Sequence, residues 1–140
     1  MDEETKREII LENYMHPDNR RDGDSEGYLK ENTNNESCID NLNIYVKINN
    51  NTIEDIYFNG EACAISTSSV SIMIHNLIGK TIKEALDYID NFEKMIEGKE
   101  YEESILNDAI VYNEIHKQNN RKNCAYLPYR GIKKILEKYL

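Results

Sequence analysis

Three cysteines and one aspartate are the side chains of this sequence best suited to hold a metal ion. Cys38 and Asp40 stand two residues apart before a predicted strand, and an extended backbone projects such residues to the same side. Cys63 lies between a predicted strand and a predicted helix, and Cys124 near the start of the last predicted helix. Three thiolates and one carboxylate can complete a tetrahedral shell around zinc. Residues at the ends of three elements can converge on one edge of a domain.

Two other interpretations of the cysteines stay open on residue types alone. Their long separations match no compact zinc-finger spacing, so they are also compatible with small buried side chains or with one nucleophilic cysteine served by a histidine base. None of His16, His75 and His116 adjoins a cysteine, and each stands where a surface or packing residue is common. Arg121, three residues before Cys124, would favour the thiolate form of that cysteine.

Length and charge restrict the class of protein. A chain of 140 residues is the usual size of one domain, so we expect residues 1–140 to form a single unit. The net charge is −9 and no face of clustered lysine and arginine is visible, which argues against nucleic-acid binding. No stretch approaches the ~20 apolar residues that span a bilayer, and the charged N-terminus lacks the apolar core of a signal peptide. We therefore expect a cytoplasmic protein with reduced thiols and no membrane association.

The first half of the chain is predicted to hold one helix and a small sheet. Apolar residues at helical spacing predict a helix from Glu3 to Met15, ended by Pro17, and the polar run from Asp18 to Glu36 reads as irregular. Period-two alternation predicts strands over Leu42–Ile48 and Ile53–Phe58, joined in a hairpin by three asparagines. Gly60 is expected to end the second strand, and residues 63–65 are read as a short third strand.

The second half is predicted to be helical. Ser66 or Thr67 is expected to cap a helix that ends near Gly79. Thr81 and Glu84 match a capping box at the start of the next helix, which extends to about Met95. Two further helices are predicted, over residues 104–115 and 124–139. The expected fold class is α+β, with a small antiparallel three-stranded sheet packed against several helices.

Four segments carry a resemblance to a known family. ESCIDNLNIYVKI, IYFNGEACAISTSSVSIMIHNLIGKTIKEA and NNRKNCAYLPYRGI resemble, in order, the three cysteine segments of the NifU-N/IscU-like proteins of iron–sulfur cluster assembly, and ILENYMHPDNR resembles the N-terminal helix of that family. The resemblance covers nearly the whole chain and implies that Cys38, Asp40, Cys63 and Cys124 share one metal ion.

Within the family the chain looks more like the SufU branch. IscU-type chains carry a histidine directly before the third cysteine, where this chain has Asn123, and Arg121 with Cys124 matches the Arg-x-x-Cys arrangement of SufU-type proteins. Residues from about 90 to 120 correspond to the SufU-type insertion, and the Leu-Pro-Pro-Val-Lys segment of IscU is absent. Ile39 and Ala62 replace two glycines usual in the family, and Asn119 and Asn120 stand where a proline is expected before Arg121, so loop mobility is expected to differ here.

The resemblance implies a function in sulfur transfer. It implies a zinc-dependent sulfurtransferase in which Cys38 accepts persulfide sulfur from a SufS-type cysteine desulfurase. Arg121 is expected to orient the docked desulfurase or a neighbouring carboxylate. Downstream iron–sulfur assembly proteins are the further partners that the resemblance implies. The alternative is a scaffold that assembles and transfers an Fe–S cluster, because thiolates suit both zinc and Fe–S clusters. A structural zinc domain is a third interpretation, against which Asp40 argues, because closed structural sites usually use Cys and His.

Overall fold

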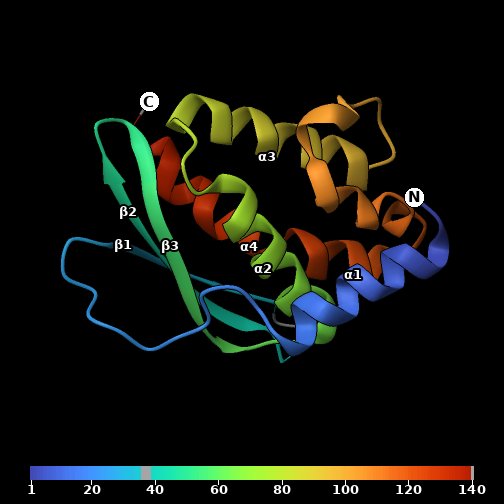
Figure 1. The fold of residues 1–140 in the computed structure, drawn as a ribbon, viewed down its shortest axis with the longest axis horizontal. Coiled ribbons are helices and arrows are strands. Elements are labelled where there is room, and N and C mark those ends of the chain that lie inside the picture. The colour runs from blue at the N-terminus through green and yellow to red at the C-terminus, as the bar shows by residue number, and fades with distance from the viewer. Residues whose placement is uncertain (36–38, 140) are drawn as a thin grey trace.

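The computed structural model describes residues 1–35 and 39–139. Within these ranges the chain forms four α-helices, three strands and three short 3-10 helices (Figure 1). In chain order they are α1 (Glu3–Met15), β1 (Leu29–Asn34), β2 (Asn41–Asn49), β3 (Thr52–Glu61), α2 (Ala64–Leu77), α3 (Ile82–Ile96), η1 (Glu103–Ile105), η2 (Asn107–Tyr112), η3 (Ile115–Lys117) and α4 (Asn119–Glu137). No helix in the described ranges has the length and apolar character needed to cross a bilayer.

The three strands form one antiparallel sheet in the order β1-β2-β3. The predicted hairpin between β2 and β3 is confirmed, and Asn50 and Asn51 turn it with φ angles of 51° and 62°, a backbone conformation that asparagine tolerates well. Gly60 does not end β3, because the strand continues to Glu61. It has a φ of +114°, and a Cβ atom there would lie 2.2 Å from the carbonyl oxygen of Asn41. Glycine therefore permits the close approach of β3 to the start of β2.

The predicted fold class is correct, but the predicted third strand is wrong. The third strand is β1, which lies in the region expected to be irregular, whereas Cys63 caps α2 and the helix begins at Ala64. Strand β1 has the polar sequence LKENTN and lies at the sheet edge, where only Thr33 is buried. Its pairing with β2 depends on backbone hydrogen bonds, which a hydrophobic pattern does not reveal.

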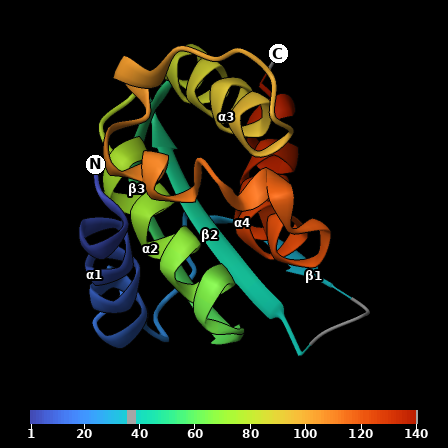
Figure 2. The ribbon, with the colours of Figure 1, turned by 90° about the vertical axis from the view of Figure 1, so that its right-hand side faces the viewer.

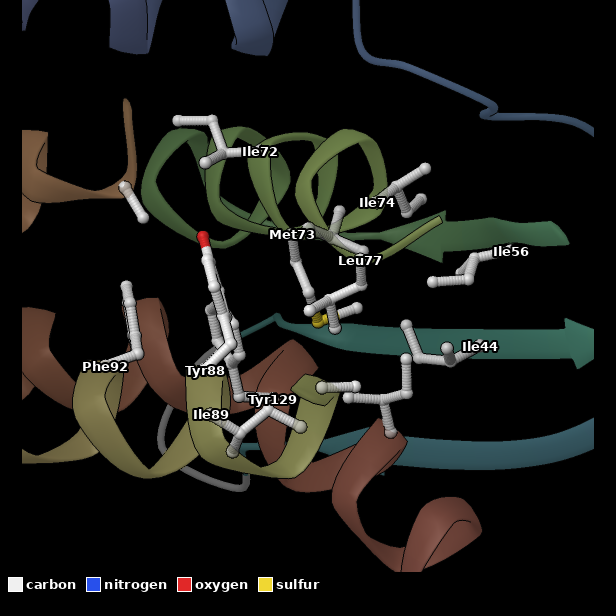
Figure 3. Close-up of a cluster of buried hydrophobic side chains, with 14 of the residues drawn as sticks. Ile44, Ile56, Ile72, Met73, Ile74, Leu77, Tyr88, Ile89, Phe92 and Tyr129 are labelled. Atoms are coloured by element: carbon white, nitrogen blue, oxygen red, sulfur yellow. The ribbon is translucent and has the colours of Figure 1, made fainter. Parts of the chain in front are cut away.

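Helices cover one face of the sheet (Figures 1 and 2). Helix α4 packs on β1 and β2, and α2 packs on β3 and along α4. Helix α1 lies against α2, and α3 lies against α4. Figure 3 shows the core between these layers, where Ile44 and Ile56 of the sheet point toward side chains of three helices. The labelled core residues from the helices are Ile72, Met73, Ile74 and Leu77 on α2, Tyr88, Ile89 and Phe92 on α3, and Tyr129 on α4.

The helical half differs from prediction in two places. The capping box at α3 is confirmed, since Thr81 Oγ1 accepts from the Glu84 amide at 3.1 Å and Glu84 Oε1 accepts from the Thr81 amide at 2.9 Å. The helix predicted over residues 104–115 is instead a series of 3-10 turns, and Asn107, the first residue of η2, has a φ of 51°. Helix α4 begins at Asn119, before Cys124, and it contains Pro128 in its interior.

Candidate metal centre

Three of the four predicted ligands converge. One carboxylate oxygen of Asp40 and the sulfurs of Cys63 and Cys124 all lie within 4.8 Å of one another. Asp40 is 1% exposed and Cys124 is 7% exposed, so the group sits largely away from water. The fourth predicted ligand, Cys38, lies outside the described residues.

Cys63 is held at the N-terminus of α2. Its sulfur accepts a hydrogen bond from the Ser66 amide at 3.5 Å and therefore serves as the N-cap. The predicted cap at Ser66 or Thr67 is thus wrong, because Ser66 lies inside the first turn. The Cys63 amide donates to Asp40 Oδ1 at 2.7 Å. The positive end of the helix dipole faces the Cys63 sulfur, which favours negative charge there.

Ser66 links the other two ligands. Its hydroxyl lies 2.8 Å from Asp40 Oδ2 and 2.9 Å from the carbonyl oxygen of Cys124, and it can donate its single hydrogen to either. That carbonyl needs a partner because Pro128, one helical turn later, has no amide hydrogen to donate back to it. Ser69 likewise donates to the carbonyl of Ala125 at 2.6 Å. Two serines of α2 therefore bond to the carbonyls that precede the proline in α4.

The charge and burial of this group favour the binding of a cation. Burial acts to raise the pKa of Asp40, but hydrogen bonds from the Cys63 amide and the Ser66 hydroxyl outweigh it and hold that pKa below its ordinary value. Burial, followed by the neighbouring Cys63 and Asp40, raises the pKa of Cys124. An ionised carboxylate thus lies beside the Cys124 sulfur, whose own ionisation is opposed unless a positive charge is nearby.

The donor set fits zinc. Ligand atoms at the usual zinc–sulfur and zinc–oxygen distances in a tetrahedron lie about 3.5–3.8 Å apart. The Cys63 sulfur lies 3.7 Å from Asp40 Oδ2, within that range. Two sulfurs and one oxygen would fill three corners, and Cys38 as the fourth ligand stays a prediction from the family resemblance.

Comparison with known proteins shows the family of the chain. The model of the NifU-like N-terminal domain matches residues 5–139. The chain belongs to the NifU-like N-terminal domain family. The zinc-dependent sulfurtransferase SufU of Bacillus subtilis (strain 168) is 33% identical over 129 residues, which are 91% of this chain and 86% of that protein. The iron–sulfur cluster assembly scaffold protein IscU of Thermotoga maritima is 31% identical over 102 residues, 73% of this chain and 72% of that protein.

Solved structures share the fold of this NifU-like domain. The crystal structure of FiSufU from the thermophile Fervidobacterium islandicum AW-1 superposes with a TM-score of 0.88 at 31% identity, covering 92% of this chain and 94% of that one. A NifU-like N-terminal protein from Brucella abortus has a TM-score of 0.80 at 18% identity and covers 99% of this chain and 100% of that one, so it shares the fold.

One of the two positions at which this NifU-like chain lacks a glycine, Ala62, needs no special backbone. In the described ranges the non-glycine residues with positive φ are Asn19, Asn50, Asn51 and Asn107, and Ala62 is not among them. The Ile39 side chain is 72% exposed and therefore packs little against the ligand beside it. The replacement at Ala62 therefore does not strain the chain next to Cys63.

The remaining predicted site residue, Arg121, lies in the first turn of α4, where it is exposed. It precedes Cys124 by three residues, so the two side chains project from neighbouring points of one helix face. No histidine belongs to the described metal group. The His75 ring contacts Asp18 and Asp108, and His116 contacts the Asn113 carbonyl. Residue patterns pointed to Ser66 only as a helix cap, and its contacts with Asp40 and Cys124 were missed because they join distant segments.

Proposed function

We propose that this chain is a zinc-dependent sulfurtransferase of iron–sulfur cluster assembly that accepts persulfide sulfur from a SufS-type cysteine desulfurase. The observation that carries the proposal is the convergence of Asp40, Cys63 and Cys124 within 4.8 Å in a largely buried group. The similarity to a zinc-dependent sulfurtransferase over most of both chains supports it. We further assign residues from about 90 to 120 to the insertion typical of the SufU branch.

Cys38 is the proposed sulfur acceptor. Its thiolate attacks the outer sulfur of the partner's persulfide, a new S–S bond forms on Cys38, the S–S bond within the partner breaks, and the partner's cysteine leaves as a thiolate. Zinc, when bound, keeps the cysteine sulfurs deprotonated and protects them until the partner arrives. Hydrogen bonds to both oxygens of Asp40 keep this carboxylate ionised and in place during the exchange.

The second candidate function is a scaffold that assembles and transfers an Fe–S cluster. It is supported by the similarity to the scaffold protein IscU of Thermotoga maritima. One residue favours sulfur transfer. Asn123, which stands where IscU-type chains carry a histidine, lies exposed on α4 directly before Cys124, and an amide is a poor ligand for iron compared with imidazole.

Metal analysis and an absorbance spectrum, before and after addition of a cysteine desulfurase and L-cysteine, test the proposal. We expect colourless protein with about one zinc per chain and faster alanine release. A brown chromophore that passes to an apo-protein would instead support the scaffold. Zinc that raises thermal stability without any sulfur transfer would support a structural zinc domain.

The acceptor is tested separately by Cys38→Ser. We expect this variant to lose both the stimulation of alanine release and the persulfide mass increase on the chain. Ser37→Ala is the matched control, because it changes the neighbouring side chain and keeps all four predicted ligands. Full stimulation by Cys38→Ser would remove Cys38 from the acceptor role.

A further inference from the structure

A pocket of about 430 Å³ is lined by residues that lie two or three positions from Cys63 and Cys124 in the sequence. It lies where α1 meets the first turns of α2 and α4 and the 3-10 segments η2 and η3. Ile65, two residues after Cys63, and Arg121, three residues before Cys124, both line it. Its volume falls in the range of small-ligand and side-chain binding sites.

The pocket carries positive charge that the described residues do not neutralise. Arg7 and Arg121 line it, and neither makes an ion pair or a hydrogen bond with any residue in 1–35 or 39–139. Lys6 also lines the pocket and is only 8% exposed. Its ammonium group can donate three hydrogen bonds, and within the same ranges it has one partner, Glu3 Oε1 at 3.0 Å.

The acidic residues of the pocket are already paired. Glu3 pairs with Lys6, and Glu114 pairs with Lys117 at 2.5 Å. The two guanidinium groups therefore remain available on a chain whose net charge is −9. A guanidinium presents a planar fork that matches a carboxylate with two parallel hydrogen bonds.

The rest of the pocket lining is largely apolar. Ile10, Ile65, Val111 and Ile115 contribute side chains to it. A pocket with apolar walls and two available guanidinium groups fits a peptide segment in which an apolar side chain adjoins an aspartate or glutamate. A small inorganic anion would leave the apolar walls uncovered.

We infer that this pocket docks an acidic segment of the protein that donates sulfur. The inference rests on the proposed function, because it takes the sulfur donor as the partner that must approach Cys63 and Cys124. A carboxylate bound by Arg7 and Arg121 anchors the donor one helical turn from the metal centre. Arg7 is the diagnostic residue, since it lines the pocket from α1 and belongs to no part of the metal group.

Calorimetric titration of the zinc-loaded chain with a purified cysteine desulfurase tests the inference. Arg7→Gln is expected to weaken binding about tenfold, the loss typical of one hydrogen bond between charged groups. Arg130→Gln is the matched control, because it removes the same charge from an exposed position of α4 outside the pocket. Glu3→Gln is expected to change binding in the opposite direction, tightening it about twofold, because it removes an anion from the pocket. Zinc content and melting temperature are measured for each variant.

Rate measurements and hydrogen exchange complete the test. Arg7→Gln should raise the concentration that gives half-maximal alanine release about tenfold and leave the maximal rate unchanged, and amides of residues 3–10 should exchange more slowly in the complex. Equal affinity of the Arg7 and Arg130 variants, or no binding by the unmodified chain, would overturn the inference. Binding that Arg7→Gln weakens, without any sulfur transfer, would keep the docking pocket and overturn the proposed function.

Discussion

The hydroxyl oxygen of Ser66 lies 2.8 Å from Oδ2 of Asp40, so a serine in the first turn of α2 holds the carboxylate that precedes β2. The same hydroxyl reaches the carbonyl of Cys124 at 2.9 Å. Residues 40, 66 and 124 therefore meet at one oxygen atom, and this contact joins the sheet to the two helices that carry the described cysteines.

Ser66→Ala is expected to weaken zinc binding roughly 10- to 100-fold, the usual effect of removing a group that orients a metal ligand. It should also destabilise the fold by roughly 1–3 kcal/mol, because a buried acceptor loses the hydroxyl hydrogen that Ser66 donates. Competition with a zinc indicator and urea unfolding measure the two effects. Ser71→Ala is the control on the same helix. The Ser71 hydroxyl donates to Asn13 Oδ1 and accepts from the Asp18 amide, away from the metal group, so its loss should lower stability alone. Unchanged zinc affinity in Ser66→Ala would contradict the orienting role.

Gly60→Ala is expected to destabilise the protein more than Gly79→Ala. Both glycines have positive φ, +114° and +91°, which costs an alanine roughly 1–3 kcal/mol. A Cβ at Gly79 meets nothing within 4 Å, whereas at Gly60 it would lie 2.2 Å from the Asn41 oxygen, adding roughly 1–3 kcal/mol of steric cost. Because Asn41 follows Asp40, Gly60→Ala should also reduce zinc content. Equal losses of stability in the two variants would show that the strands relax without cost.

The stability contributed by His75 is expected to depend on pH. Its Nδ1 lies 2.6 Å from Asp18 Oδ2 and its Nε2 2.7 Å from Asp108 Oδ2. The hydrogen bond to Asp108 is the main cause that raises the pKa of His75, outweighing burial, and Asp18 adds to it. The charged ring thus favours the folded state below its unfolded pKa of about 6.5, and this contribution disappears as pH rises through the higher folded pKa.

The contact between His75 and Asp108 also limits this stabilisation at low pH. Burial acts to raise the pKa of Asp108, but the hydrogen bonds from His75 and Asn76 outweigh it and lower that pKa. The contribution is therefore also lost as pH falls through the lowered pKa of Asp108. Urea unfolding across a pH series should show the largest deficit of His75→Gln between about pH 5 and pH 6.5, with a shrinking deficit at higher pH. A deficit that grows with rising pH would contradict this assignment.

Removal of the metal is expected to lower the melting temperature reversibly. Zinc that binds the folded state alone stabilises it by about 4 kcal/mol at a free concentration near 1,000 times its Kd. A chelator should therefore lower the melting temperature of the unmodified chain and leave that of a Cys63→Ser, Cys124→Ser double variant nearly unchanged. Differential scanning calorimetry with and without chelator measures both. An equal shift in the two proteins would place the bound zinc elsewhere.

Much of the fold could be predicted because its signals are local. The period-two run of β2 and the capping box of Thr81 and Glu84 each lie within a few neighbouring residues, and both are present in the structure. Strand β1 was missed because its polar sequence is ordered by pairing with β2 at a distance in the chain. The 3-10 segments between α3 and α4 have apolar residues near helical spacing, but Asn107 at the start of η2 has a positive φ, which is incompatible with one continuous α-helix.

The grouping of three predicted ligands could be expected from the sequence, whereas the residues that hold them in place could not. Asp40, Cys63 and Cys124 have side chains whose chemistry is apparent from residue type, and the family resemblance grouped them. Ser66 and Pro128 are ordinary residues in their own helices. Their roles arise from the contact between α2 and α4, which depends on the way the two helices pack.

The serine–carbonyl bonds beside Pro128 restrict how α2 and α4 can move relative to each other. Sliding α2 along α4 by a helical turn would separate Ser66 and Ser69 from the carbonyls of residues 124 and 125, leaving these polar groups unpaired in the interior. The two helices should consequently move as one rigid body, with the sulfurs of Cys63 and Cys124 at a constant separation. When an incoming group replaces a ligand, Cys38 is then the predicted ligand expected to leave, while Cys63, Cys124 and the Asp40 carboxylate that is bonded to α2 stay in place.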